Sequence, residues 1–238
     1  PCFQMYIFNI NDFKWTLVRK YIKKKNDSLC LDKTSLLLGI GNVVYIKIMT
    51  EREKMLAGEI YDCGDEQLIE RWHLAKQLQK KYSETDSRDR DTLNSILDEL
   101  IGGRGDNVWI AAPFFVDYGE NIFIGNNVEI NMNCVFLDCN RISIGSYSGI
   151  GPGVHIYTVT HPVNPKERLP ENSQFWKSYT APVTIGNNVW IGGGAILLPG
   201  VIIGDNTTIG AGSVVTKSIP DNCIAAGNPC RVIRKIDE

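Results

Sequence analysis

The chain has 238 residues, of which 43% are hydrophobic, and its formal net charge is -2. This length and apolar content allow a large buried core. The near-neutral charge excludes the strongly basic surface with which proteins bind nucleic acid. The seven cysteines form no C-x-x-C pair, so neither a disulfide framework nor a zinc knuckle is indicated, and we expect a reducing, cytoplasmic location.

Residues 1–48 differ in character from the rest of the chain. They carry the basic run "RKYIKKKND" and then the apolar stretch "LLLGIGNVVYIKI". At 13 residues this stretch is shorter than the length of about 20 that spans a bilayer, and it lacks the order of parts of a signal peptide. We therefore expect no membrane segment, and we interpret residues 1–48 as an upstream extension; the alternative is a genuine appendage of the domain.

Residues 49–106 have a helical pattern. Thr50 can begin a helix, because Glu53 follows at the distance that a capping box requires. Further on, apolar residues recur with helical spacing on both sides of the polar break "SETDSRDRD", and "GG" follows the second run. These residues are Leu68, Trp72, Ala75 and Leu78, then Leu93, Ile96, Leu97 and Leu100. The pattern predicts a small helical cap.

From residue 107 onward, apolar residues recur every six positions. A helix repeats every 3.6 residues and a strand every 2, so neither gives this spacing. A coil of short parallel strands does, with one inward aliphatic side chain per strand and glycine at the corners. The series are Ile124, Ile130, Phe136 and Ile142; Ile144, Ile150 and Ile156; and Ile185, Ile191, Leu197, Ile203, Ile209 and Val215.

The six-residue spacing stops between Ile156 and Ile185. This interruption predicts a loop that leaves the coil over residues 158–182, and functional residues are often found on loops that a rigid scaffold holds. It contains His161 and three aromatic residues, Phe175, Trp176 and Tyr179. We expect the aromatic side chains to pack over the functional site or over a neighbouring subunit.

Several segments resemble known enzymes. The stretch "IGNNVWIGGGAILLPGVIIGDNTTIGAGSVVTKSIPDNCIAAGNPCRVIRKI" resembles the hexapeptide-repeat acyltransferases. "MTEREKMLAGEIYD", "DYGENIFIGNNVEINMNCVFLD", "THPV" and "AAGNPCRVIRKI" are similar, more closely, to the maltose, galactoside and nodulation-type sugar O-acetyltransferases. The resemblance covers residues 49–238.

The resemblance implies a mainly β fold. Residues 107–238 would form a left-handed parallel β-helix with an extruded loop, behind a helical cap over residues 49–106. Its handedness is an exception to the usual right-handed crossover and follows from the resemblance alone. The resemblance also implies a homotrimer with active sites between neighbouring subunits, and acetyl-CoA as the acetyl donor without a metal.

Moving an acetyl group to a hydroxyl needs a base that removes the hydroxyl proton, and histidine, with a pKa near 6.5, suits this role. The chain has three histidines. We expect His73 to be a solvated residue of the cap helix and His155 to be part of the coil wall beside Ile156. His161 stands at the interruption and matches the "THP" catalytic motif of the resembled family, so it is the predicted general base.

The resemblance also indicates residues for the acceptor. Asn131 matches a substrate-contacting asparagine, although an asparagine can equally stabilise a corner of the coil. Asp62 and Asp117 match acceptor-binding positions, and Asp138 could line the same cleft. Cys139 stands where the galactoside enzymes have an acidic residue, which argues against a galactoside preference.

For the donor, the resemblance implies a site along the C-terminal turns of the coil. Trp190 would cover the pantetheine arm, although an outward aromatic residue can also be a trimer contact. The Gly193 N–H would meet the thioester carbonyl, and arginines in "PCRVIRKI" would meet the phosphates unless they are an ordinary basic terminus. The predicted donor-binding residues are Trp190, Gly193, Ala211, Thr216, Lys217, Arg231 and Arg234.

The sequence therefore predicts an acetyl-CoA-dependent O-acetyltransferase that acts on a sugar or related acceptor by direct transfer. One alternative is a xenobiotic, antibiotic-directed O-acetyltransferase of the same fold, against which the helical cap argues. A zinc lyase on this coil needs three converging histidines, and the ligand count fails. A non-catalytic repeat scaffold is the third alternative, and the presence of His161 and Asn131 argues against it.

Overall fold

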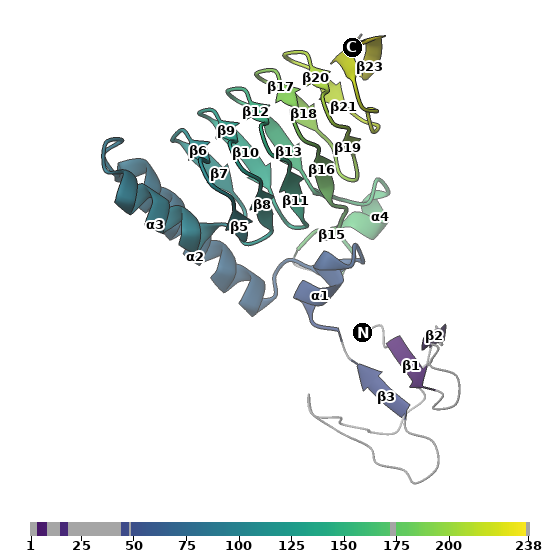
Figure 1. Cartoon of the computed structure of the whole chain (residues 1–238). Helices are drawn as coiled ribbons and strands as arrows, with labels where there is room; N and C mark the ends of the chain where they lie inside the picture. Colours follow the sequence, from purple (N-terminus) through teal and green to yellow (C-terminus); the bar gives the residue numbers. More distant parts are fainter. Residues whose placement is uncertain (1–3, 9–14, 19–43, 48, 172–174, 237–238) are drawn as a thin grey trace. The chain divides into compact units, whose positions relative to one another are not determined.

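The computed structural model describes residues 4–8, 15–18, 44–47, 49–171 and 175–236. The chain divides into two compact units, Pro1–Glu53 and Lys54–Glu238. Figure 1 labels the elements of both.

In the first unit, a small antiparallel sheet has the strand order β2-β1-β3. Its strands are β1 (Gln4–Phe8), β2 (Trp15–Val18) and β3 (Val44–Lys47). The remaining residues of the predicted extension over residues 1–48 lie outside the described residues.

The predicted capping box is confirmed at the start of α1 (Glu51–Leu56). The Thr50 N–H donates to Glu53 Oε2 over 3.0 Å, and the Glu53 N–H donates to Thr50 Oγ1 over 3.2 Å. Each side chain satisfies a backbone donor that the first helical turn leaves without a partner.

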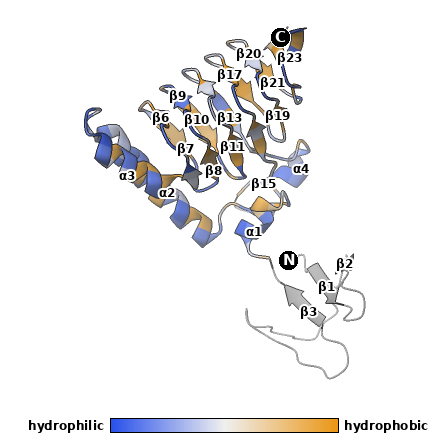
Figure 2. Cartoon of the chain, viewed as in Figure 1, coloured by the Kyte–Doolittle hydropathy of each residue, from blue (hydrophilic) through white to orange (hydrophobic). Residues whose placement is uncertain are grey.

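Two helices, α2 (Glu66–Glu84) and α3 (Arg90–Leu100), lie side by side at the start of the coil (Figure 1). Asp65 and Asp89 cap their N-termini. The predicted inward residues are buried, except for Trp72, which is exposed. Figure 2 shows hydrophilic and hydrophobic residues alternating along both helices. Among the described residues, no helix has the length and apolar composition needed to cross a membrane.

The cap covers the first edge of the coil. Gln79 on α2 accepts a hydrogen bond from the Val116 N–H at 2.9 Å and donates to the Val116 carbonyl at 3.1 Å. Tyr82 donates to the Ile110 carbonyl at 2.7 Å. An open sheet edge would leave such backbone groups unpaired, so the two side chains replace the strand that is missing there.

The coil has three sheets, which the chain visits in turn. The β13 sheet contains β7 (Phe114–Val116), β10 (Cys134–Leu137), β13 (His155–Tyr157), β18 (Ile196–Leu197) and β21 (Val214–Val215). The β11 sheet contains β5 (Gly103–Arg104), β8 (Ile122–Ile124), β11 (Ile142–Ile144), β16 (Val183–Ile185) and β19 (Ile202–Ile203). All these strands pair in parallel.

The β12 sheet closes the third side and extends furthest. It contains β6 (Trp109–Ile110), β9 (Glu129–Ile130), β12 (Gly149–Ile150), β17 (Trp190–Ile191), β20 (Thr208–Ile209), β22 (Cys223–Gly227) and β23 (Cys230–Lys235). Its strands are parallel up to β22, and β23 then pairs antiparallel with β22. This last hairpin is at the C-terminal end of the coil (Figure 1).

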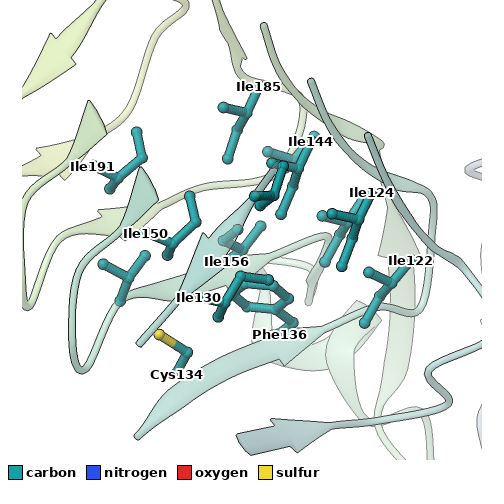
Figure 3. Close-up of a cluster of buried hydrophobic side chains, with 14 of the residues drawn as sticks. Ile122, Ile124, Ile130, Cys134, Phe136, Ile144, Ile150, Ile156, Ile185 and Ile191 are labelled. Carbon is teal, nitrogen blue, oxygen red and sulfur yellow. The ribbon is translucent and has the colours of Figure 1, made fainter. Parts of the chain in front are cut away.

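The core consists of the residues that recur every six positions. Every member of the three series is buried, and Figure 3 shows Ile130, Phe136, Ile150 and Ile156 converging in the interior. Burying one such side chain contributes about 1.5–3 kcal/mol, so the repeated core stabilises each turn against its neighbours. The prediction of a parallel coil from the spacing is confirmed.

One corner of the coil is built from asparagines in the left-handed backbone region, with φ between 54° and 56°. Asparagine adopts this conformation at lower cost than most residues. These residues are Asn107, Asn127, Asn188, Asn206 and Asn222. Side-chain hydrogen bonds of 2.9–3.1 Å link neighbouring turns along this column. Tyr147, with φ 60°, takes the asparagine's place in one turn.

Candidate active site

The interruption predicted over residues 158–182 is partly regular structure. The chain leaves the coil through β14 (Val159–Thr160), forms α4 (Pro165–Arg168) and returns through β15 (Lys177–Thr180). β15 pairs antiparallel with β14 on one side and with β4 (Tyr61–Asp62) on the other. This small sheet therefore joins the loop to the segment that precedes α2.

His161 directly follows β14 and is half-buried. Its Nδ1 lies 3.0 Å from the Lys177 carbonyl oxygen and 3.2 Å from Ser178 Oγ. A carbonyl oxygen can only accept a hydrogen bond, so Nδ1 carries a proton, and in the neutral imidazole Nε2 then keeps its lone pair. This is the tautomer that a general base needs, with the proton-accepting nitrogen directed away from its anchor.

Of the three loop aromatic residues expected over the functional site or a neighbouring subunit, Trp176 contacts His161. Its ring is perpendicular to the His161 imidazole, at 89°, with ring centroids 5.2 Å apart. Phe175 lies instead against Gly64, where any Cβ would collide with the phenyl ring. Tyr179 is an exposed residue of β15.

Asp62 lies in the same small sheet as the anchor of His161. It pairs with Lys177 across β4 and β15. Asp62 Oδ1 accepts a hydrogen bond from the Gly64 N–H at 2.9 Å, and Oδ2 lies 3.6 Å from Lys177 Nζ. The structure thus brings this predicted acceptor residue close to the histidine, although the two are about a hundred positions apart in the sequence.

Asp117 follows β7 at the corner nearest the cap. Oδ1 lies 3.9 Å from Lys76 Nζ, and the Cys139 thiol donates to Oδ2 at 3.5 Å. Burial raises the pKa of Asp117, and the Lys76 cation opposes that rise. Burial also lowers the pKa of Lys76 and raises that of the Cys139 thiol well above its usual range. Arg71, on the same helix as Lys76, forms an ion pair with Glu120.

Asp138 has a different environment from the one predicted. Its side chain is 0% exposed and accepts hydrogen bonds from the N–H groups of Asp117, Tyr118 and Asn121 at 3.0, 2.8 and 3.3 Å. Burial raises its pKa to about 6. The carboxylate closes the turn after β7 and has no exposed atom for an acceptor, so the predicted position of Asp138 on the cleft wall is not found.

Asn140 is a buried residue that sequence reasoning missed. Its Nδ2 donates to the Leu56 carbonyl at 3.2 Å and to Thr180 Oγ1 at 2.8 Å, and Thr180 in turn donates to the Met55 carbonyl. Asn140 thus ties the coil to α1 and to β15. No local pattern marks this role, because its partners lie 40 and more than 80 positions away.

Three predicted residues follow strands of the β12 sheet and lie at the edge where the strands of the β13 sheet begin. These are Asn131, Gly193 and Ala211. The Gly212 N–H donates to the Gly193 carbonyl at 2.9 Å, so this edge continues from turn to turn. Among the described residues, neither the Gly193 N–H nor the Ala211 N–H at this edge donates to another protein group.

Other predicted residues lie at the opposite edge, where strands of the β13 sheet end. Thr216 and Lys217 follow β21 and are exposed, and His161 lies beyond the end of β13 on the same side. The strands of the β13 sheet are parallel, so their starts lie along one edge of the sheet and their ends along the other. Within one chain, Asn131 and Gly193 therefore lie at one edge and His161 at the opposite edge.

The remaining donor residues lie on the outer surface. Trp190 on β17 is exposed, and its ring edge lies next to Gly149 of β12. Arg231 and Arg234 are exposed residues of β23 in the C-terminal hairpin. The described part of the chain contains no group of three or more His, Cys, Asp or Glu side chains arranged to hold a metal ion.

Sequence comparisons relate the chain to known families. Residues 182–217 match the bacterial transferase hexapeptide family with six repeats, and residues 54–105 match the maltose acetyltransferase hexapeptide capping motif. A "Putative acetyltransferase" of Dictyostelium discoideum is 45% identical over 188 residues, which cover 79% of this chain and 95% of that protein. Another of the same description, from Staphylococcus aureus strain MRSA252, is 46% identical over 190 residues and covers 79% and 93%.

Solved structures are similar over most of the chain. A galactoside acetyltransferase in complex with coenzyme A has a TM-score of 0.75 and 39% identity, covering 80% of this chain and 92% of that one. A maltose O-acetyltransferase from Clostridium difficile 630 has a TM-score of 0.73 and 46% identity, covering 80% and 99%. A hexapeptide-repeat acetyltransferase of Vibrio cholerae, complexed with acetyl coenzyme A, has a TM-score of 0.71 and 32% identity, covering 80% and 100%.

The repeated coil, the helical cap and these relatives define an acetyltransferase built on hexapeptide repeats. The chain belongs to the hexapeptide-repeat acetyltransferase family, in the group of the maltose and galactoside O-acetyltransferases. The predicted family and mainly β fold are confirmed, and solved neighbours bound to coenzyme A or acetyl coenzyme A agree with the predicted donor.

Proposed function

We propose that this protein transfers the acetyl group of acetyl-CoA to a hydroxyl of a sugar or related polyol, with His161 as the general base. The observation that carries the proposal is the hydrogen bond from Nδ1 to the Lys177 carbonyl at 3.0 Å. It leaves Nε2 as the proton acceptor of a half-buried imidazole next to a small sheet that also holds Asp62.

The chain's residues account for each step of direct transfer. Nε2 of His161 accepts the proton of the acceptor hydroxyl while its oxygen bonds to the thioester carbonyl carbon. The Gly193 N–H donates to the oxyanion that develops on that carbonyl. The carbon–sulfur bond then breaks, and the proton on His161 passes to the departing thiolate. Acetate ester and free thiol are formed without a covalent enzyme intermediate.

The division of residues between two edges of the β13 sheet supports a site shared between chains. His161 and Lys217 lie at one edge, and Asn131 and Gly193 at the other, so one chain alone supplies only half of the machinery. A cyclic homotrimer, in which one edge faces the opposite edge of the next copy, would complete three equivalent sites. The molar mass in solution, measured by light scattering, tests this assembly.

For the acceptor, two carboxylates are available near the loop. Asp62 and Asp117 can accept hydrogen bonds from sugar hydroxyls, and both are only partly buried. Similarity to a maltose O-acetyltransferase and to a galactoside acetyltransferase supports a sugar, while Cys139 favours an acceptor other than a galactoside. We do not include Asp138 among the acceptor contacts.

The test is a thiol-release assay with acetyl-CoA and a panel of sugars, polyols and hydroxyl-bearing antibiotics. The wild type should release coenzyme A with a sugar or polyol, and His161→Ala should lower kcat by about a thousandfold or more while binding acetyl-CoA normally in calorimetry. His73→Ala is the matched control, because His73 is exposed on α2 and should keep wild-type kinetics. Turnover that survives in His161→Ala would remove the base assignment, and turnover with antibiotics alone would remove the acceptor class.

A further inference from the structure

The indole of Trp176 packs edge to face against the imidazole of His161, and none of the motifs quoted for the resembled family includes Trp176. We propose that Trp176 is a positioning residue that holds the plane of the His161 ring, so that Nε2 points in one direction. The inference rests on the proposed function, because it concerns the residue to which that function assigns the proton transfer.

The hydrogen bond at Nδ1 does not fix the imidazole by itself. It holds one ring atom 3.0 Å from the Lys177 carbonyl, and the ring can still tilt about that bond. Ser178 Oγ, at 3.2 Å from the same nitrogen, restrains the same atom and not the tilt. The direction of Nε2, on the far side of the ring, therefore needs a second contact.

Trp176 supplies that contact. The two rings are perpendicular, at 89°, with a centroid separation of 5.2 Å. Edge-to-face pairs at this separation are a favoured arrangement of aromatic rings and are attractive beyond the burial of their surface. A tilt of the imidazole breaks this arrangement, so the indole favours one ring plane over the others.

Trp176 is itself held from several sides. The Arg168 guanidinium of α4 lies over its ring at 5.0 Å from the centroid. The Cys63 thiol donates to its carbonyl at 3.7 Å, next to β4. The following residue, Lys177, is paired with Asp62 in the small sheet. An indole restrained in this way keeps its position, so it can hold the plane of the imidazole ring.

The sequence arrangement strengthens the proposal, since adjacent residues make complementary contacts with one ring. Lys177 contributes the backbone carbonyl that selects the tautomer, and Trp176 contributes the side chain that selects the plane. A displacement of this dipeptide would disturb both directly. A change of the Trp176 side chain leaves the Lys177 carbonyl in place and acts on the ring plane, and it affects the hydrogen bond to Lys177 only through that plane.

The experiment compares Trp176→Leu and Trp176→Phe with the wild type. Loss of the aromatic ring should lower kcat by about 10- to 100-fold, the range that a misdirected catalytic group produces, while the KM for acetyl-CoA stays unchanged. Phenylalanine keeps an aromatic partner and should recover activity to within about threefold of the wild type. Phe175→Leu is the matched control, because Phe175 is similarly exposed, 43% against 49%, and lies against Gly64.

A second readout does not depend on activity. In protein labelled with 15N-histidine, the His161 signal, assigned with His161→Ala, should report the Nδ1–H tautomer in the wild type and in Phe175→Leu. In Trp176→Leu it should report a mixture of tautomers, because the loosened ring weakens its bond to Lys177.

Three results would overturn the proposal. One is wild-type kcat and tautomer in Trp176→Leu, and another is a raised acceptor KM at unchanged kcat, which would make Trp176 a pocket wall. The third is a fall in kcat in Phe175→Leu that is as large as the fall in Trp176→Leu. Unchanged turnover in His161→Ala is a different result that removes the proposed base, and the tautomer measurement still decides the role of Trp176 in that case.

Discussion

The Nδ1 atom of His161 lies 3.0 Å from the backbone carbonyl oxygen of Lys177, which comes from the strand that returns to the coil. A backbone acceptor cannot change its protonation and moves only if the strand moves. It therefore fixes the histidine tautomer more firmly than a side-chain hydroxyl, which can both donate and accept. Ser178 Oγ, at 3.2 Å from the same atom, is such a hydroxyl.

We predict that Ser178→Ala lowers kcat by less than about fivefold, because the hydrogen bond that it loses is worth about 1 kcal/mol and does not set the tautomer. Steady-state kinetics with acetyl-CoA and the best acceptor checks this. Circular dichroism should be run alongside, since Ser178 is buried. A fall of several hundredfold in a folded variant would mean that the hydroxyl, and not the carbonyl, selects the tautomer.

The coil could be predicted from the sequence because its signal is local. The inward residues, such as Ile130 and Ile191, recur at a spacing that neither a helix nor an ordinary strand produces, and the capping box of Thr50 and Glu53 is complete within four residues. His161 stands out as a candidate because it lies where the spacing stops and matches the "THP" motif of the resembled family.

The contacts that make the site could not be predicted in this way. The anchor of His161 is 16 positions away, and it becomes a neighbour only because β15 returns beside β14. Asp138 is predicted to line the acceptor cleft, but its carboxylate accepts hydrogen bonds from backbone N–H groups 17 to 21 positions upstream. Such roles depend on the path of the chain, and a residue pattern does not contain that path.

The buried carboxyl of Asp138 leads to a prediction about pH. Its pKa is raised by burial from 3.8 to about 6, so the folded protein holds this proton more tightly than the unfolded chain does. The contribution of the group to stability is therefore fully present below pH 4 and is lost as the pH rises through 6. A shift of this size corresponds to about 3 kcal/mol.

Asp138→Asn has no proton to lose at this position. The free energy of unfolding of the wild type, minus that of the variant, should therefore fall between pH 4 and pH 6 and level off above pH 7. Urea unfolding of both proteins over this range measures the difference. A difference that does not change with pH would mean that the backbone donors keep Asp138 ionised throughout.

Tyr147 leads to a prediction of a stabilising change. It has φ 60° and interrupts a column in which Asn127 and Asn188 occupy the corresponding corners. For a residue other than glycine, asparagine or aspartate, this backbone conformation costs about 1–2 kcal/mol. Tyr147 is also 65% exposed, so its replacement removes little buried surface.

We predict that Tyr147→Asn raises the free energy of unfolding by about 1 kcal/mol and the midpoint of thermal unfolding by about 2–4 °C. Tyr147→Ala is the control, because alanine loses the ring without gaining asparagine's tolerance of this conformation. Thermal unfolding of the three proteins compares them. An equal gain in both variants would attribute the effect to the tyrosine ring and not to the backbone.

Asn140 leads to the last prediction, which connects stability with activity. Its amide donates to the Leu56 carbonyl and to Thr180 Oγ1, so it holds the end of β15 three residues beyond the anchor of His161. Asn140→Ala leaves buried acceptors without a donor and should lower the free energy of unfolding by about 1–3 kcal/mol. It should also lower kcat about tenfold, because a displaced β15 misplaces the Lys177 carbonyl.

Unfolding in urea and kinetics on the folded variant measure these effects separately. Asn94→Ala is the control, because Asn94 is exposed on α3 and its change should stay within about 0.5 kcal/mol. Asn140→Asp should lower the free energy of unfolding and kcat at least as much as Asn140→Ala does, since a carboxylate cannot donate to the Leu56 carbonyl. If Asn140→Ala were less stable yet turned over at the wild-type rate, Asn140 would stabilise the fold without positioning His161, and the pairing of β15 with β4 and β14 would be enough to hold Lys177.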